Sequence, residues 1–205
     1  MPEKDWTALE AGITEEFDDK RYEAAAERLL KSYGPQVLGY LVRALGDPAE
    51  ASEVYAMFCE DLWKGLPTFE KRSSFRTWSY RLATSARAHF RRDPGRRRGR
   101  PLMSDELNAL AEKVRTDTLP YLKTDVKDRF AALRRELSEE EQLLLTLRVD
   151  RDMDWKDIAL IFAETADEIS EVELDSRSAA LRQKFKRTKD KLRKLAESAG
   201  LLPTD

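Results

Sequence analysis

Arginine and aromatic residues recur about one helical turn apart between Ser73 and Arg92. At helical spacing, one side of this stretch is apolar and is expected to pack inward. That side carries Phe75, Trp78, Leu82, Ala86 and Phe90. The other side carries Arg76, Tyr80, Thr84, Arg87 and Arg91. Ser73 or Ser74 is expected to cap the first turn with its hydroxyl. A basic face that bears a ring predicts a contact with nucleic acid, and a solvated surface helix is the alternative.

The residue types that catalysis or metal binding would need are scarce. Cys59 is the one cysteine and His89 the one histidine. A structural zinc site needs about four ligands and a disulfide needs two cysteines, so neither can form within one chain. No glycine-rich phosphate loop is present, and the carboxylates follow ordinary helical pairing distances. We therefore expect a protein that is not an enzyme and that uses no cofactor and no metal.

The charge distribution is more informative than the total. The 205 residues carry a net charge of −2. Residues 71–100 nevertheless hold eleven Lys or Arg against Asp93 alone, and residues 177–194 hold nine against Asp190 alone. Two basic blocks in an otherwise acidic chain predict two nucleic-acid contacts and other surfaces for protein partners.

The periodicity predicts an all-α fold of two small helical domains joined by a flexible linker, since eight glycines and eight prolines are too few for a turn-rich β protein. The expected parts are a leader helix over 1–19, a helical domain over 20–93, a linker over 94–121 and a second helical domain over 122–200. The first domain should contain helices broken near Gly34-Pro35. The arginine cluster of the linker, residues 96–100, is either solvated or a further phosphate contact.

Local signals place several helix boundaries. Asp47 should cap a helix that begins at Pro48, and Ser138 with Glu141 forms a capping box. A short helix is expected over 154–161 and a long basic one over 176–198. No stretch reaches the roughly 20 apolar residues of a membrane span and the N-terminus lacks a secretory pattern, so we expect a cytoplasmic protein without membrane contact.

Residues 66–69 and 73–83 resemble the promoter-reading segment of extracytoplasmic-function sigma factors, the small bacterial initiation subunits. The resemblance extends over residues 20–92, and residues 122–197 resemble the second domain of that family, a helix-turn-helix. It implies an alternative sigma factor that binds core RNA polymerase at its clamp and flap and directs promoter recognition and transcription initiation.

The resemblance also implies two sets of DNA-binding residues. Those for the −10 element are Phe69, Lys71, Arg72, Ser74, Arg76, Tyr80, Thr84, Arg87 and Arg91. Those for the −35 element are Arg177, Ser178, Arg182, Gln183 and Lys186, at the start of a helix expected to enter the major groove. Phe69 to Arg76 resembles the loop and helix start with which the family captures an unstacked base of the melted strand. Trp78 supports promoter melting or belongs to the core.

The sequence departs from the family at the polymerase-docking stretch, for which we expect Glu50, Ser52, Glu53 and Met57. Ser52 stands where the family has the first of two adjacent acids, and Ala56 and Met57 replace a Gln-Glu pair. Docking should therefore be weakened. Phosphorylation of Ser52 by a Ser/Thr kinase would restore negative charge; the alternative is that Glu50 and Glu53 suffice.

A second departure is the long acidic connection over 163–175, where a helix-turn-helix turn usually takes about 3–4 residues. It is either an exposed insertion or a segment that screens the basic helix. Two other classes of function stay open: a helix-turn-helix regulator that acts without polymerase, and a protein-only module such as an anti-sigma decoy. An anti-sigma factor is a further candidate partner.

Overall fold

The computed structural model describes residues 6–92, 103–124, 129–163 and 169–201. These residues form helices and connecting turns and contain no strand, which confirms the all-α prediction. The chain divides into two compact units, Met1–Tyr121 and Leu122–Asp205. Among the described residues, no helix is both long enough and apolar enough to cross a bilayer.

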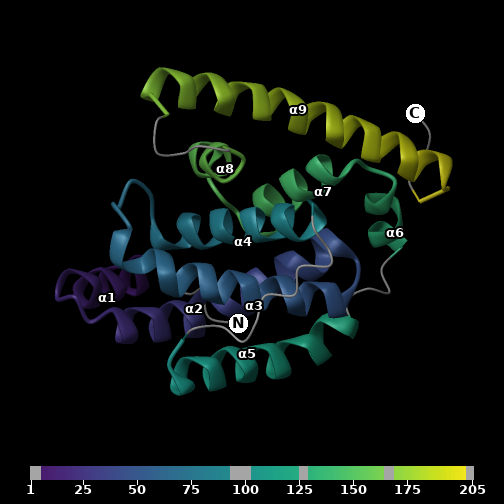
Figure 1. The fold of residues 1–205 in the computed structure, drawn as a ribbon. Helices are drawn as coiled ribbons and strands as arrows, with labels where there is room; N and C mark the ends of the chain where they lie inside the picture. Colours follow the sequence, from purple (N-terminus) through teal and green to yellow (C-terminus); the bar gives the residue numbers. More distant parts are fainter. Residues whose placement is uncertain (1–5, 93–102, 125–128, 164–168, 202–205) are drawn as a thin grey trace. The chain divides into compact units, whose positions relative to one another are not determined.

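Four helices of the first unit lie side by side in Figure 1. They are α1 (Trp6–Asp18), α2 (Tyr22–Leu45), α3 (Pro48–Gly65) and α4 (Phe75–Arg92), with the short 3₁₀ turn η1 (Leu66–Thr68) after α3. Asp47 accepts a hydrogen bond from the Ala49 N–H, which confirms it as the cap of α3. The predicted break near Gly34-Pro35 is wrong, because α2 runs through Pro35 without interruption.

The core of this unit lies where α2, α3 and α4 meet. Its largest fully buried side chains are Tyr33, Tyr40, Tyr55, Phe58 and Tyr80. Tyrosine combines a large apolar ring with a hydroxyl that needs a partner when it is buried. A core so rich in tyrosine therefore also needs polar side chains directed inward.

The structure shows a helix in the predicted leader and another in the predicted linker. Helix α1 buries Ile13 and Glu16 in the first unit and so is part of that domain. Residues 105–124 form the helix α5 (Asp105–Thr124), whose Leu107 and Val114 are buried. These two side chains are seven residues apart and share a helix face, which is why the segment folds as an amphipathic helix. The arginine cluster over 96–100 lies outside the described residues.

The second unit contains α6 (Arg129–Arg135), α7 (Glu139–Leu145), the π-helical turn η3 (Thr146–Asp150), α8 (Trp155–Ile161) and α9 (Glu171–Ser198). Helix α9 is the long helix of this unit, with α8 packed against its N-terminal half (Figure 1). Ser138 and Glu141 form the predicted capping box of α7. Helix α9 begins at Glu171, five residues before the predicted start, because Ser170 caps it by accepting from the Glu173 N–H. The end of the acidic connection is therefore helical.

Candidate nucleic-acid interface

The segment that leads into α4 is held by aromatic packing. The Phe69 ring lies 4.9 Å from that of Phe75 and 4.7 Å from that of Trp78, measured between centroids. Trp78 is 5% exposed and therefore belongs to the core. Ser74 caps α4, since its Oγ accepts from the Thr77 N–H at 3.0 Å. The residues predicted to capture a base thus sit on a rigid support.

The basic residues of this segment are engaged within the first unit. Lys71 is exposed and pairs with Asp18 of α1. Arg72 is exposed and pairs with Glu70 at 2.6 Å. The Arg76 guanidinium lies over the Trp6 ring, 4.7 Å from its centroid. Lys71 and Arg72 could exchange their intramolecular partners for a phosphate at little cost, because exposed ion pairs contribute little to stability.

The predicted DNA-facing side of α4 is correct only in part. Arg91 is exposed, but Tyr80 is completely buried and Arg87 is 9% exposed. The Tyr80 ring packs edge-on against that of Tyr40, with 5.5 Å between centroids. Helix α4 packs against both α2 and α3, so the inward side is wider than the apolar stripe alone indicates.

The exposed side of α4 is a different stripe, which the sequence analysis missed. Arg81, Ser85, His89 and Arg92 follow one another at intervals of three or four residues and are exposed or half-buried. The spacing signal was present, since these four positions share one helix face. We call these four residues the α4 outer stripe. Two arginines and a histidine on one face, with Arg91 beside them, form a basic surface suited to phosphate contacts.

The predicted docking stretch on α3 presents its two acids and buries its other two residues. Glu50 and Glu53 are exposed, whereas Ser52 and Met57 are each 8% exposed. The Ser52 hydroxyl donates to the Pro48 carbonyl at 2.8 Å. Met57 faces the core, so its contribution is to packing. The accessible acidic patch is thus smaller than the predicted set of four.

The five predicted −35 residues lie in the N-terminal and central parts of α9 but do not share one environment. Ser178 is 1% exposed and donates to the Trp155 carbonyl at 3.3 Å. It therefore faces the interior of the unit. Arg177 is exposed and pairs with Glu173 at 2.7 Å, and Arg182 lies over the Trp155 ring at 5.9 Å. Gln183 and Lys186 are exposed. Four of the five side chains can thus reach a ligand.

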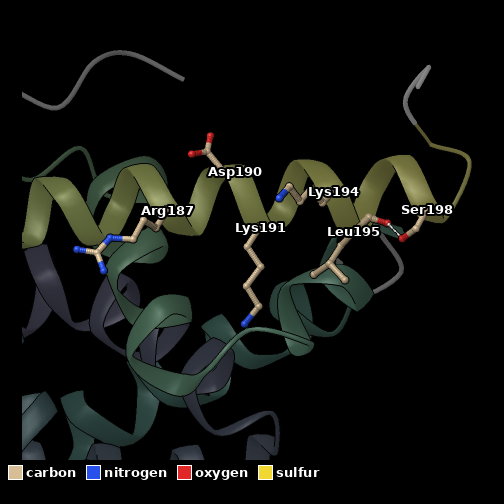
Figure 2. Close-up of a pocket in the computed structure, with 6 residues that line it drawn as sticks. All are labelled: Arg187, Asp190, Lys191, Lys194, Leu195 and Ser198. Atoms are coloured by element: carbon tan, nitrogen blue, oxygen red, sulfur yellow. Dashed lines mark hydrogen bonds between the residues drawn. The ribbon is translucent and has the colours of Figure 1, made fainter. Parts of the chain in front are cut away.

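The C-terminal half of α9 carries a shallow open groove (Figure 2). Its lining residues are Arg187, Asp190, Lys191, Lys194, Leu195 and Ser198. Lys191 extends back toward α7, where it pairs with Glu141 at 3.1 Å. This region contributes positive charge along one side of the helix, which suits phosphate rather than base contacts.

The acids at the start of α9 are paired with cations of the same unit. The Lys156 ammonium lies 3.0 Å from Asp175 and 3.1 Å from Glu171. The hydrogen bonds to these two carboxylates, Asp175 first, raise the pKa of Lys156 above its usual value. Glu173 holds Arg177. The described acids at the start of α9 are therefore paired with the cations Lys156 and Arg177. Residues 164–168 of the acidic connection lie outside the described residues.

A comparison with curated protein sequences finds no match to the chain. A family model does match part of it: residues 29–97 match Sigma-70 region 2. The matched segment begins within α2 and includes all of α3 and α4. Helix α1, helix α5 and the second unit lie outside it. The core of the first unit is therefore similar to Sigma-70 region 2, and this similarity supports a sigma factor with a role in RNA polymerase binding and promoter recognition.

Proposed function

We propose that the protein is an alternative sigma factor of the extracytoplasmic-function type, which binds core RNA polymerase and directs transcription initiation. The observation that carries the proposal is the Sigma-70 region 2 match on a domain whose helix α4 exposes a basic stripe. In the proposed division of labour, the first unit binds the polymerase clamp and the −10 element. The second unit binds the −35 element and the polymerase flap.

The arrangement of α8 and α9 supports the role given to the second unit. Two packed helices, of which the second is long, basic and exposed along one side, resemble a helix-turn-helix. The candidates for base edges are then Arg177, Arg182, Gln183 and Lys186, and the groove of Figure 2 is the candidate for phosphates.

The test is reconstitution with core polymerase on genomic promoter fragments, followed by run-off transcription. The proposed function requires a specific transcript that depends on both the protein and the core enzyme. A helix-turn-helix regulator would bind the fragments without core enzyme and yield no transcript. A protein-only module would bind its partner with little dependence on salt, because steep salt dependence comes from phosphate contacts.

The α4 outer stripe gives a sharper version of this test. Replacing Arg81 and Arg92 by alanine should make the negative slope of log affinity against log salt shallower by about 2, since each lost phosphate contact reduces its magnitude by roughly 1. Lys31→Ala is the matched control, because Lys31 is an exposed cation of α2 that pairs with Glu27. An unchanged slope in the double variant would remove α4 from the DNA interface.

Regulation by a Ser/Thr kinase at Ser52 belongs to the same proposal. Glu50 and Glu53 flank Ser52 on α3, so a phosphate there would enlarge a small acidic patch. Ser52 is the fifth residue of α3 and lies in its second turn, where the helix dipole contributes little. Because Ser52 is 8% exposed, the kinase must act on a form in which this turn has opened. Equal polymerase binding by Ser52→Ala, Ser52→Glu and kinase-treated wild type would contradict this regulation.

A further inference from the structure

The carboxylate of Glu10 in α1 accepts three hydrogen bonds from two other helices. Its Oε2 accepts from the Phe75 N–H at 2.9 Å, and its Oε1 accepts from the Arg76 N–H at 2.9 Å. The Tyr33 hydroxyl of α2 donates to Oε1 at 2.7 Å. Glu10 is half-buried. One side chain from outside the matched segment therefore joins α2 to the start of α4.

Glu10 completes the hydrogen bonding of the first turn of α4. The first four N–H groups of a helix have no acceptor within the helix and need one elsewhere. Here Ser74 Oγ accepts from Thr77 and the Ser74 carbonyl accepts from Trp78 at 3.0 Å. Glu10 supplies the two acceptors for Phe75 and Arg76. A negative charge at this end of the helix is also favoured by the helix dipole.

Helix α1 contacts the same segment at further points. The Trp6 ring stacks on that of Tyr33, with 5.6 Å between the ring centroids. The Arg76 guanidinium lies over the Trp6 ring. The Phe17 ring lies 6.1 Å from that of Phe69 and 5.5 Å from that of Phe75. These contacts involve both ends of residues 69–76, so α1 helps to determine where this segment lies.

We propose that Glu10 is a positioning residue for the recognition of single-stranded promoter DNA, acting through the backbone of Phe75 and Arg76. The inference rests on the proposed function, which assigns the −10 element to the first unit, and it takes residues 69–76 as the segment that captures an unstacked base. Capturing a base requires a pocket of fixed shape, because unstacking costs a few kcal/mol that pocket contacts must offset. Without the Glu10 carboxylate, two amides lose their acceptors and the first turn of α4 loosens. Phe69 and Arg76 then lose their fixed positions.

The experiment compares holoenzymes that contain wild type, Glu10→Ala, Glu10→Gln or Glu15→Ala. Glu15 is the matched control, since it lies on the same helix and its side chain is 76% exposed. The probes are the single-stranded non-template oligonucleotide of a selected promoter and the upstream duplex of that promoter. We expect Glu10→Ala to weaken single-strand affinity about tenfold while duplex affinity stays within about twofold. Glu10→Gln should recover part of the loss because its amide oxygen still accepts a hydrogen bond.

Tyr33→Phe separates positioning from simple loss of stability. This variant removes one bond to Glu10 from a buried site but leaves both amide bonds in place. It should lower the unfolding midpoint and leave single-strand affinity unchanged. The inference is overturned if Glu10→Ala behaves like Glu15→Ala, or if Tyr33→Phe weakens single-strand binding as much as Glu10→Ala does. If wild-type holoenzyme itself binds no promoter strand, the proposed function fails instead.

Discussion

The Tyr40 hydroxyl of α2 donates to Thr84 Oγ1 of α4 at 2.7 Å, and Thr84 Oγ1 in turn donates to the Tyr80 carbonyl at 2.8 Å. Burial raises the pKa of Tyr40, so the phenol stays protonated and needs an acceptor. Thr84 was predicted to face DNA. Its hydroxyl instead serves a tyrosine of the core.

Replacing Thr84 by valine should destabilise the first unit. Valine preserves the shape of the side chain but leaves the Tyr40 hydroxyl buried without its acceptor, which costs about 1–3 kcal/mol. Thr84→Ser is the control, because it retains the hydroxyl. The free energy of unfolding in urea measures the effect. Equal stability of the valine and serine variants would contradict this account.

The sequence was a good guide wherever the controlling contact is local. Asp47 and the pair Ser138 and Glu141 cap their helices as predicted, because each partner lies within three residues. The region 2 match likewise covers the segment from which the promoter-reading resemblance was inferred. The helix caps could therefore be predicted from the sequence, because their hydrogen bonds join residues that are close together in the chain.

The sequence was a poor guide wherever the partner comes from a distant helix. Ser178 is polar and predicted to be exposed, but the Trp155 carbonyl accepts its hydrogen bond inside the unit. Tyr80 is amphipathic, and it faces inward because its ring packs against that of Tyr40. Glu10 lies 65 residues from Phe75 in sequence. No periodicity signals such pairs, since they depend on how helices pack after they form.

Replacing Gly34 by alanine should destabilise the first unit although alanine is the better helix former. A Cβ at this position would lie 2.6 Å from the Tyr55 hydroxyl and 3.1 Å from Val114 Cγ1. Overpacking of a core typically costs about 1–3 kcal/mol, which exceeds the roughly 0.5–1 kcal/mol gained from helix propensity. The added substitution Tyr55→Phe removes the closest atom and should restore part of the stability.

Gly12→Ala is the matched control for this prediction. A Cβ at Gly12 would lie 3.4 Å from the Arg28 guanidinium, the flexible end of a side chain. The thermal unfolding midpoint is measured for the wild type, Gly34→Ala, the double variant with Tyr55→Phe, and Gly12→Ala. A Gly34→Ala variant as stable as Gly12→Ala would show that α5 and Tyr55 leave more room than the structure indicates.

Cys59 should not react with thiol reagents while the first unit is folded. The side chain is fully buried, and burial raises the pKa of its thiol to about 12. The thiolate is the reactive form, so almost none is present at pH 8. We expect no colour change with a disulfide reagent in native buffer and one equivalent of reaction in denaturing urea. Fast labelling of the native protein would contradict the burial of Cys59.

The second unit should lose stability in acid through Glu141. The Ser138 N–H first, and then Lys191, hold the pKa of this carboxyl below its ordinary value of 4.5. A carboxyl whose folded-state pKa is lowered stabilises the fold at pH values above the unfolded pKa. That contribution is lost as the pH falls from about 4.5 through the folded-state value.

Replacing Glu141 by glutamine should therefore narrow the difference in unfolding free energy between pH 7 and pH 3. At pH 7 the variant is expected to be about 1 kcal/mol less stable, because it loses the charge-assisted bonds of the capping box. At pH 3 the unfolding free energy of the wild type approaches that of the variant. Glu139→Gln, an exposed residue of the same turn, controls for the change in net charge. A constant gap between wild type and Glu141→Gln across this range would mean that the bonds to Ser138 and Lys191 do not favour the ionised carboxylate.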